Sequence, residues 1–458
     1  CEWRGPRPVL TYIGHMRRAT SQPGGPEERE FEHAATDLLD ARWDSVPRAD
    51  MAGLVDGASR VLAIGTDIRQ LVAAVGATLA DLARAGTEVT MIVIESTDSS
   101  DSRLPAIPLL PKVSRWDLRS TEAGALDGVV HDRLVPLLDD RAVVIAPTGA
   151  AECPVARAAT AAARQKAARL LEYDPWPWFS AGDDDSFWSR ARWLVPSLTG
   201  LRDKNLALEQ LGPPCPAVSS LAVEVALVPQ NPDLAARVAA VSRSAARSRD
   251  IAAPFDMMFD DGNEDPWHLD DSPYEQRRLA LVLACLGRPR YRRVIEVGCA
   301  TGQLTATLAH RADEVIAMDA SPKALAVARR RVGAANVRWV LGAAPQDFPD
   351  ADSDLVVLSE IGYFLDGPDL LSTVRAARRN LAPGGELLMA NWRRSTEHIP
   401  LDGPAAQRQT AAVLDLPLRA RYEDADLVVE VWGQPESVHD EYDGAVLHRQ
   451  GFDQARSG

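Results

Sequence analysis

Apolar and polar positions alternate through residues 60–205 in a pattern that predicts a strand, a helix and a second strand in succession. The apolar run 61–64 and the β-branched run 88–94 suit buried strands, and the amphipathic stretch 71–85 suits a helix that ends at Gly86. Two strands joined by a helix within about 35 residues form a βαβ unit, which implies a parallel sheet.

The same pattern continues toward the middle of the chain. It predicts another buried strand at 142–146 and an Ala-rich helix at 155–171. Residues 172–200 combine four tryptophans with much polar sequence, and we expect an irregular loop region there. The Ala- and Arg-rich stretch 230–255 is expected to be a helical connector.

A second α/β pattern begins at Arg293. Its strands are expected near 294–297, 315–318, 337–341, 354–358 and 386–390, with helices between them. The predicted fold is therefore α/β, with two domains that each have a mainly parallel sheet flanked by helices. The expected divisions are an N-terminal extension that is partly loop (1–57), a first domain (58–229), the connector (230–255) and a second domain (256–458).

Composition and charge narrow the classes of partner. The 458 residues are too many for one ordinary core, and 46% hydrophobic with 25% charged residues is typical of a globular protein. The five cysteines are scattered without a CxxC pair, which predicts neither a disulfide framework nor a thiolate zinc site and favours a cytoplasmic location. A net charge of −15 argues against a nucleic-acid partner, and no apolar run predicts a membrane span. Nothing in the pattern indicates an oligomeric state.

A glycine-rich turn follows the first strand of the second domain. Gly298 and Gly302 allow the backbone to pass close to a ligand, and a helix from Gln303 to Ala309 follows. The next strand ends in Asp319, about 20 residues after the turn, where an acid accepts hydrogen bonds from ribose hydroxyls. The spacing predicts a site for a nucleoside-containing cofactor.

Two cofactor classes share this geometry, and the residue before the turn separates them. A dinucleotide site has the pattern G-x-G-x-x-G, whereas here Glu296 precedes the turn and the third glycine is missing. A carboxylate there would repel a pyrophosphate, but it can pair with the amino group of a methionine moiety. The turn therefore favours S-adenosylmethionine over NAD.

The order of these blocks, together with the strand 354–358 that delivers Ser359 and Glu360 and the turn at 381–386, resembles that of class I methyltransferases. The resemblance extends from about Asp256 to about Trp432. It implies that S-adenosylmethionine is the cofactor, with adenine near Ala344 and Gln346. The other expected cofactor contacts in this segment are Glu296, Gly298, Ala300, Gly302, Asp319 and Ala320.

A closer resemblance links this region to the NodS-like family, through DPWHL at 265–269, SPYEQRR at 272–278, VLSEIGYFL at 357–365 and NWR at 391–393. The namesake N-methylates the free amine of a de-N-acetylated chitooligosaccharide, and its leading segment folds over the cofactor. The resemblance implies that Trp267 and Tyr274 close the site and that Arg277 pairs with the methionine carboxylate. The alternatives are a packing role for Trp267 and a surface ion pair for Arg277. Asn391 departs from the family, where His is frequent.

Methyl transfer requires an aligned nucleophile, a site free of water and the removal of one proton. Glu360 is the candidate for taking that proton or for gripping an amino group, and Tyr363 is the candidate positioning hydroxyl. The alternative for Glu360 is a structural acid at a strand end.

Residues 58–205 resemble the PIG-L (LmbE-like) zinc N-deacetylases, in VLAI at 61–64, GATLA at 76–80, GTEVT at 86–90 and YDPWPW at 173–178. The family's His-Pro-Asp-Asp signature falls on Asp67-Ile68-Arg69-Gln70, and its later His-Pro-Asp-His block ends here in Ala156. Zinc needs three ligands with suitable geometry, which these residues cannot supply. The resemblance thus implies a deacetylase fold without metal.

The sequence therefore predicts a methyltransferase whose partner is a small-molecule acceptor, first of all the amine of an amino sugar or glycoside. O-methylation of a glycoside or natural-product hydroxyl is the alternative within the same class. A non-catalytic S-adenosylmethionine-binding or scaffold protein is the alternative from another class.

Overall fold

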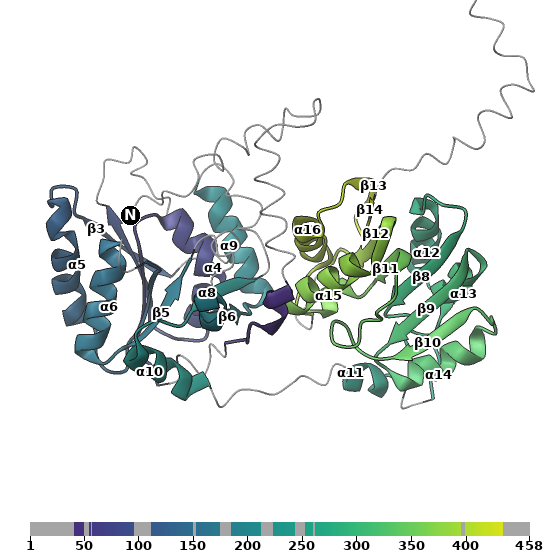
Figure 1. The fold of residues 1–458 in the computed structure, drawn as a ribbon, viewed down its shortest axis with the longest axis horizontal. Helices are drawn as coiled ribbons and strands as arrows, with labels where there is room; N and C mark the ends of the chain where they lie inside the picture. The colour runs from purple at the N-terminus through teal and green to yellow at the C-terminus, as the bar shows by residue number, and fades with distance from the viewer. Residues whose placement is uncertain are drawn as a thin grey trace, which may run out of the picture. The chain divides into compact units, whose positions relative to one another are not determined.

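The computed structural model describes residues 41–49, 55, 57–95, 111–149, 153–174, 185–211, 223–242, 252–259, 262–394 and 399–433. The chain divides into two compact units (Figure 1). Residues 1–248 with Asp366–Pro368 form unit 1, and the remainder from Arg249 onward forms unit 2. Most of the expected N-terminal extension lies outside the described residues.

Unit 1 is a seven-stranded mixed sheet in the order β3-β2-β1-β4-β5-β7-β6. The first five strands in this order are parallel, and β7 runs antiparallel to both β5 and β6. Its strands are β1 (Val61–Gly65), β2 (Val89–Glu95), β3 (Lys112–Asp117), β4 (Val143–Pro147), β5 (Arg169–Tyr173), β6 (Ala191–Leu194) and β7 (Glu224–Leu227). Its helices are η1 (Ala41–Ser45), α4 (Ile68–Arg84), η2 (Ala123–Ala125), α5 (Leu126–Leu134), η3 (Val135–Leu137), α6 (Pro154–Lys166), α8 (Asp185–Arg190), α9 (Leu198–Gln210) and α10 (Pro232–Ser242).

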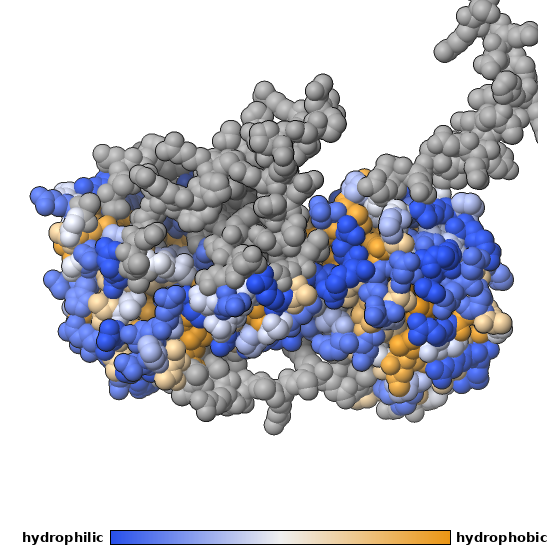
Figure 2. All heavy atoms as spheres, viewed as in Figure 1, coloured by the Kyte–Doolittle hydropathy of each residue, from blue (hydrophilic) through white to orange (hydrophobic). Residues whose placement is uncertain are grey.

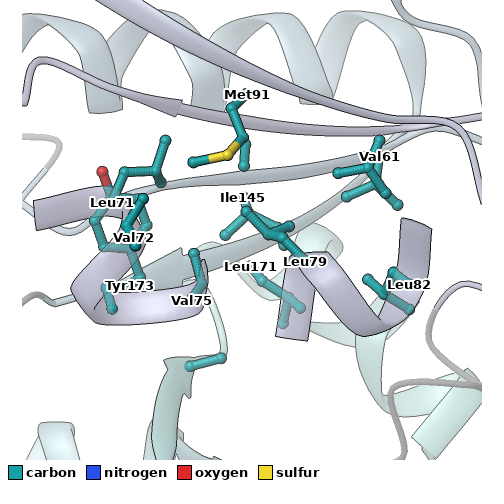
Figure 3. Close-up of a cluster of buried hydrophobic side chains, with 14 of the residues drawn as sticks. Val61, Leu71, Val72, Val75, Leu79, Leu82, Met91, Ile145, Leu171 and Tyr173 are labelled. Carbon is teal, nitrogen blue, oxygen red and sulfur yellow. The ribbon is translucent and has the colours of Figure 1, made fainter. Parts of the chain in front are cut away.

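The alternation of side chains along each strand gives unit 1 a core on both faces of its sheet. Val61 and Ala63 pack with α4 on one face, whereas Leu62 and Ile64 pack with α5 and α6 on the other. Figure 3 shows the first of these clusters. A buried ion pair between Lys204 of α9 and Glu224 of β7 (3.1 Å) links these two elements on the face of the sheet that α4 covers.

Two predictions for unit 1 were wrong. The helix expected at 155–171 ends at Lys166, because Ala167 adopts a left-handed conformation (φ 57°) and β5 begins at Arg169. The loop region expected at 172–200 contains α8, β6 and the start of α9. Within the stretch 230–255, α10 contributes Leu234 and Val238 to the two cores of unit 1.

Unit 2 repeats the same strand order with its own elements, β10-β9-β8-β11-β12-β14-β13. Its strands are β8 (Tyr291–Val297), β9 (Ala312–Asp319), β10 (Val337–Leu341), β11 (Ser353–Ser359), β12 (Leu381–Trp392), β13 (Leu418–Glu423) and β14 (Leu427–Gly433). Its helices are α11 (Ala252–Met257), α12 (Pro273–Cys285), α13 (Gln303–His310), α14 (Pro322–Arg331), η5 (Gly362–Phe364), α15 (Gly367–Asn380) and α16 (Gly403–Leu414). The five predicted strands are confirmed, and they form the parallel part of this sheet. The sequence analysis did not predict β13 and β14, which are antiparallel. The α/β fold with two mainly parallel sheets is thus confirmed.

The described surface is largely hydrophilic on the face seen in Figure 2, with apolar residues scattered among polar ones. No helix among the described residues is long and apolar enough to cross a membrane. Cys153 is disulfide-bonded, which the spacing of the cysteines did not predict, whereas Cys285 and Cys299 are free.

The carboxyl end of β1 in unit 1 is covered by the side chain of Tyr173. Its hydroxyl donates to the carbonyl oxygen of Ile64 (3.2 Å), and the ring is buried beside Leu71 and Val72, as Figure 3 shows. A Cβ on Gly65 would lie 2.5 Å from this hydroxyl. In open α/β sheets ligands bind beyond the carboxyl ends of the strands, so the protein fills that position beside β1 itself.

Replacing Gly65 with alanine is expected to destabilise unit 1 by about 1–3 kcal/mol, because the new methyl group displaces the Tyr173 hydroxyl from a filled core. Urea denaturation measures the change. Gly128→Ala in α5 is the matched control, since a Cβ there meets no atom within 4 Å and alanine favours a helix interior by roughly 0.5–1 kcal/mol. A Gly65→Ala protein as stable as wild type would contradict the close packing.

Candidate active site

The glycine turn of unit 2 joins β8 to α13 at the point where the strand order reverses between β8 and β11. Gly298 (φ +75°), Ala300 (φ 48°) and Gly302 (φ +88°) all have left-handed backbone, so the chain reverses within a few residues. A Cβ on Gly302 would lie 3.1–3.3 Å from Val332 and Ala328. Glycine is therefore needed there both for its φ and for the close approach of this turn to α14.

Asp319 ends β9 beside this turn. One of its carboxylate oxygens accepts a hydrogen bond from the amide of Ala300 (2.8 Å), and the other accepts from the amide of Ser321 (2.9 Å). Ala320 stands between Asp319 and Ser321 in this turn. Burial raises the pKa of Asp319 above its ordinary value, although these amides oppose the shift. The predicted neighbours Gly298, Ala300, Gly302 and Asp319 are thus brought together at the carboxyl ends of β8 and β9.

Glu296 lies within β8 and is buried, with only 3% of its surface exposed. The hydroxyl of Thr305 on α13 donates to it at 2.6 Å. Burial raises the pKa of Glu296 to about 8, so the carboxyl group is largely protonated at neutral pH unless a cation comes beside it. Sequence reasoning did not identify Thr305 as its partner.

Glu360 follows β11 in a left-handed conformation (φ 58°) that is unusual for a residue other than glycine. Its amide donates to the carbonyl oxygen of Ala390 (2.8 Å), which fixes the turn against β12. Its carboxylate accepts hydrogen bonds from two phenols, Tyr274 of α12 at 3.1 Å and Tyr363 of η5. Three predicted site residues, Tyr274, Glu360 and Tyr363, therefore form one cluster, although Tyr274 is 86 positions from Glu360 in the sequence.

Burial raises the pKa of Glu360 to about 7, against the opposing charge of Arg278 and the two phenol donors. Burial and the neighbouring carboxylate also raise the pKa of both tyrosines, Tyr274 and Tyr363, so these remain hydrogen-bond donors. A carboxyl group with a pKa near 7 can exchange a proton at physiological pH, which an ordinary glutamate does poorly.

Arg278 is the cation of α12 that faces this cluster. Only 8% of its surface is exposed, and it donates to Ser359 Oγ (2.6 Å) and to Glu275 (2.9 Å). Arg277, to which the methionine carboxylate was assigned from resemblance, is exposed. It donates to Tyr422 (2.7 Å) and forms an ion pair with Asp424, at the edge strand β13.

Arg277 therefore contacts β13, which β14 and β12 separate from β11 in the sheet. Sequence reasoning missed Arg278. Its spacing of four from Tyr274 and the spacing of three for Arg277 both fit a shared helix face, so spacing alone does not separate the two.

The remaining predicted residues lie around the β9 and β10 side. Trp267 packs edge-on against Phe259 (ring centroids 5.5 Å apart), next to Val327 of α14. The loop after β10 begins beside Asp319, since the Gly342 amide donates to the Asp319 carbonyl oxygen (3.0 Å). Within that loop Ala344 is buried and Gln346 is exposed.

Among the described residues no group of three or more His, Cys, Asp or Glu side chains is placed to hold a metal ion. In unit 1, Asp67 instead caps α4 by accepting the amide of Arg69 (2.8 Å), and Ala156 is buried in α6.

Comparison with known proteins identifies the fold of this site. The family model "Nodulation protein S (NodS)" matches residues 257–396, which include the glycine turn, Asp319 and Glu360. Unit 2 is a NodS-like methyltransferase domain of the S-adenosylmethionine-dependent class. The model does not reach unit 1, whose family it leaves unidentified.

Curated relatives with two different names match part of the chain. Nodulation protein S of Rhizobium tropici is 35% identical over 133 residues, which is 28% of this chain and 56% of the relative. Trans-aconitate 2-methyltransferase of Mycobacterium sp. (strain KMS) is 40% identical over 112 residues, which is 24% of this chain and 41% of the relative. The chain therefore spans only about half the length of these relatives.

Among solved structures, N-methyltransferase NodS from Bradyrhizobium japonicum WM9 in complex with S-adenosyl-L-homocysteine aligns with 41% of this chain and 100% of its own length. The sequence identity is 23% and the TM-score is 0.37.

Proposed function

We propose that this protein transfers a methyl group from S-adenosylmethionine to the amine of an amino sugar or glycoside. The observation that carries the proposal is Glu360, a buried carboxyl group with a pKa of about 7 that is held by two phenols at the carboxyl end of β11. The relatives support it, since those named nodulation protein S include a structure described as an N-methyltransferase.

The residues around the glycine turn fit the cofactor. Gly298 and Gly302 leave the backbone bare, Asp319 offers a carboxylate for the ribose hydroxyls, and the buried Glu296 is ready to pair with the methionine amino group. Ala300 and Ala320 flank Asp319, and Ala344 lies on the loop toward which adenine would extend. When bound, the cofactor supplies an electrophilic methyl group on its sulfonium.

We assign Glu360 to the binding and deprotonation of the methyl acceptor. As a carboxylate it grips an ammonium group and receives the proton that an amine must lose when its nitrogen becomes a nucleophile. The Tyr274 and Tyr363 hydroxyls hold the carboxylate in place and leave it little freedom to turn away. Tyr363 is thus a positioning hydroxyl in this proposal.

Arg278 rather than Arg277 is assigned to the methionine carboxylate, because it is the one that faces the carboxyl end of β11. Arg278→Gln is expected to weaken S-adenosylhomocysteine binding about tenfold or more, the worth of one charge-assisted hydrogen bond, whereas Arg277→Gln changes it less than about twofold. Isothermal titration calorimetry measures both.

Glu275 loses its partner in Arg278→Gln, so the double variant Arg278→Gln/Glu275→Gln separates binding from folding. The assignment predicts that this double variant folds and still binds weakly. Equal losses in Arg277→Gln and Arg278→Gln would contradict it.

The function is tested by incubating the full chain with S-adenosylmethionine labelled in its methyl group and a panel of glucosamine, de-N-acetylated chitobiose and the N-acetylated forms of both. Label is expected on nitrogen, as identified by mass spectrometry. The proposal fails if the protein binds the cofactor but labels none of the free amines while labelling hydroxyl or carboxylate acceptors.

That contrary outcome would support a second function, O-methylation. The likeness to trans-aconitate 2-methyltransferase favours it, since the name of that enzyme states a carboxylic acid acceptor. A carboxylate acceptor would need a cation of its own near Glu360, whereas Arg278, the cation that faces this cluster, is already assigned to the methionine carboxylate. That is why we place the amine first.

We further infer that unit 1 is a PIG-L-like deacetylase fold that has lost its zinc chemistry. Support comes from Asp67, whose carboxylate is engaged with Arg69, and from Ala156, which lacks any ligand atom. Measurement of bound zinc in the purified protein tests this inference, and a stoichiometric amount would overturn it.

A further inference from the structure

A hollow of about 360 Å³ opens on unit 1 over one face of β1, β2 and β3, from Arg60, Glu88 and Lys112 at their amino ends to Trp116 near the carboxyl end of β3. It is separate from the carboxyl end of β1, which Tyr173 covers and beyond which ligands of such sheets usually bind. Its size falls within the range of small-ligand sites, roughly 300–1,000 Å³. The residues that the argument uses are Arg60, Thr90, Lys112, Ser114, Trp116 and Arg133.

The floor of the hollow belongs to the face of the sheet that packs against α5 and α6. Strand register places Thr90 beside both Leu62 and Lys112, and Ser114 beside Ile92. Leu62 and Ile92 are core residues of this face, whereas Thr90 and Ser114 carry hydroxyls and are only partly buried. The sheet thus presents hydrogen-bonding groups next to apolar surface at the bottom of the hollow.

The rim is basic. Lys112 and Arg133 form no ion pair with a carboxylate in the part of the chain that the structure describes. The Arg60 guanidinium is 4.0 Å from Glu88, and the Arg133 guanidinium lies 5.9 Å from the ring centroid of Trp116. Three cations against one acid stand out in a protein with a net charge of −15.

We propose that this hollow binds a sugar phosphate. Lys112, Arg133 and Arg60 supply the charge that a phosphate group requires. Trp116 and the floor offer apolar surface to one face of a sugar ring, and the hydroxyls of Thr90 and Ser114 bond to sugar hydroxyls. The site is independent of the methyltransferase chemistry of unit 2.

Titration of the full chain with glucose 6-phosphate, inorganic phosphate and glucose by calorimetry tests the proposal. Glucose 6-phosphate is expected to bind at least about fivefold more tightly than phosphate, and glucose alone not measurably up to about 10 mM. Lys112→Ala/Arg133→Ala is expected to weaken binding about tenfold or more, and Trp116→Ala to remove the advantage over phosphate. Binding should weaken as salt rises, because exposed charges are screened.

Arg164→Ala/Lys166→Ala on α6 is the matched control, since it removes two cations of unit 1 outside the hollow. It should bind glucose 6-phosphate like wild type. The proposal is overturned if this control loses as much affinity as Lys112→Ala/Arg133→Ala, if phosphate binds as tightly as glucose 6-phosphate, or if neither binds. Thermal unfolding of each variant checks that unit 1 remains folded.

Discussion

Replacing Asp319 with alanine is expected to weaken binding of S-adenosylhomocysteine by roughly 10²–10⁴-fold. In the proposed cofactor site the carboxylate at the end of β9 accepts two ribose hydroxyls, and hydrogen bonds to a charged group contribute about 1.5–3 kcal/mol each. The same carboxylate accepts the amides of Ala300 and Ser321, so its loss also loosens the turn that approaches the cofactor. Calorimetric titration gives the affinity directly.

Asp313→Ala is the matched control, because Asp313 stands near the start of the same strand and forms an exposed ion pair with Arg290. It is expected to leave the affinity unchanged. A second variant, Asp319→Asn, keeps the size of the side chain and removes its charge, and an intermediate affinity is expected. If Asp319→Ala binds within about threefold of wild type while remaining folded, the cofactor does not contact β9 as proposed.

The turn around Asp319 was predictable from the sequence because its signals are local. Left-handed backbone needs glycine at Gly298 and Gly302, and an apolar strand that ends in an acid is visible in a single window of sequence. Four of the five parallel strands of unit 2 were predictable for the same reason, since each contains a buried apolar run, whereas β10 is more exposed.

The cluster around Glu360 was only partly predictable. The resemblance indicated Tyr274, and the requirements of methyl transfer indicated Glu360 and Tyr363, but the hydrogen bond between Tyr274 and Glu360 joins residues 86 positions apart. Arg277 and Arg278 are three and four positions from Tyr274, and both spacings are compatible with a shared helix face. Which of the two faces the Glu360 cluster depends on how α12 docks against the sheet, and that is a tertiary property.

Unit 1 shows a different reason for failure. The Ala-rich run that predicts a helix continues without a glycine or proline into Arg169–Tyr173, which forms β5. A short apolar segment cannot be assigned to helix or strand from periodicity alone. The left-handed Ala167 that separates the two elements carries no glycine or proline signal.

Glu360→Gln is expected to lower methyl transfer by roughly 10²–10⁴-fold, the usual worth of a general base, because glutamine cannot accept the proton or hold a positive charge. S-adenosylhomocysteine affinity should change less than about threefold, since Glu360 lies on the acceptor side of the site. Initial rates with an acceptor found in the amine panel, together with calorimetry, separate the two effects. An unchanged rate would remove Glu360 from the proposed chemistry.

The same substitution has an opposite effect on stability. The pKa of Glu360 is raised from 4.5 to about 7 in the folded protein, so between these values the unfolded chain releases a proton that the folded protein retains. Stability therefore falls as pH rises from about 4.5 to about 7, by an order of 3 kcal/mol, and the loss persists above pH 7. Glu360→Gln does not titrate, so it should be more stable than wild type at pH 8 and lack this fall.

Tyr274→Phe provides the control that ties both effects to one carboxyl group. The Tyr274 hydroxyl lowers the pKa of Glu360 by donating to it, so its removal should move the pH midpoint of methyl transfer upward from about 7. Comparing variants with one acceptor cancels the ionisation of the acceptor itself. A midpoint that does not move in Tyr274→Phe, combined with a wild-type pH dependence of stability in Glu360→Gln, would make Glu360 a structural acid at a strand end. If the midpoint shifts in Tyr274→Phe and the pH dependence of stability changes in Glu360→Gln, the titrating group of the reaction is Glu360.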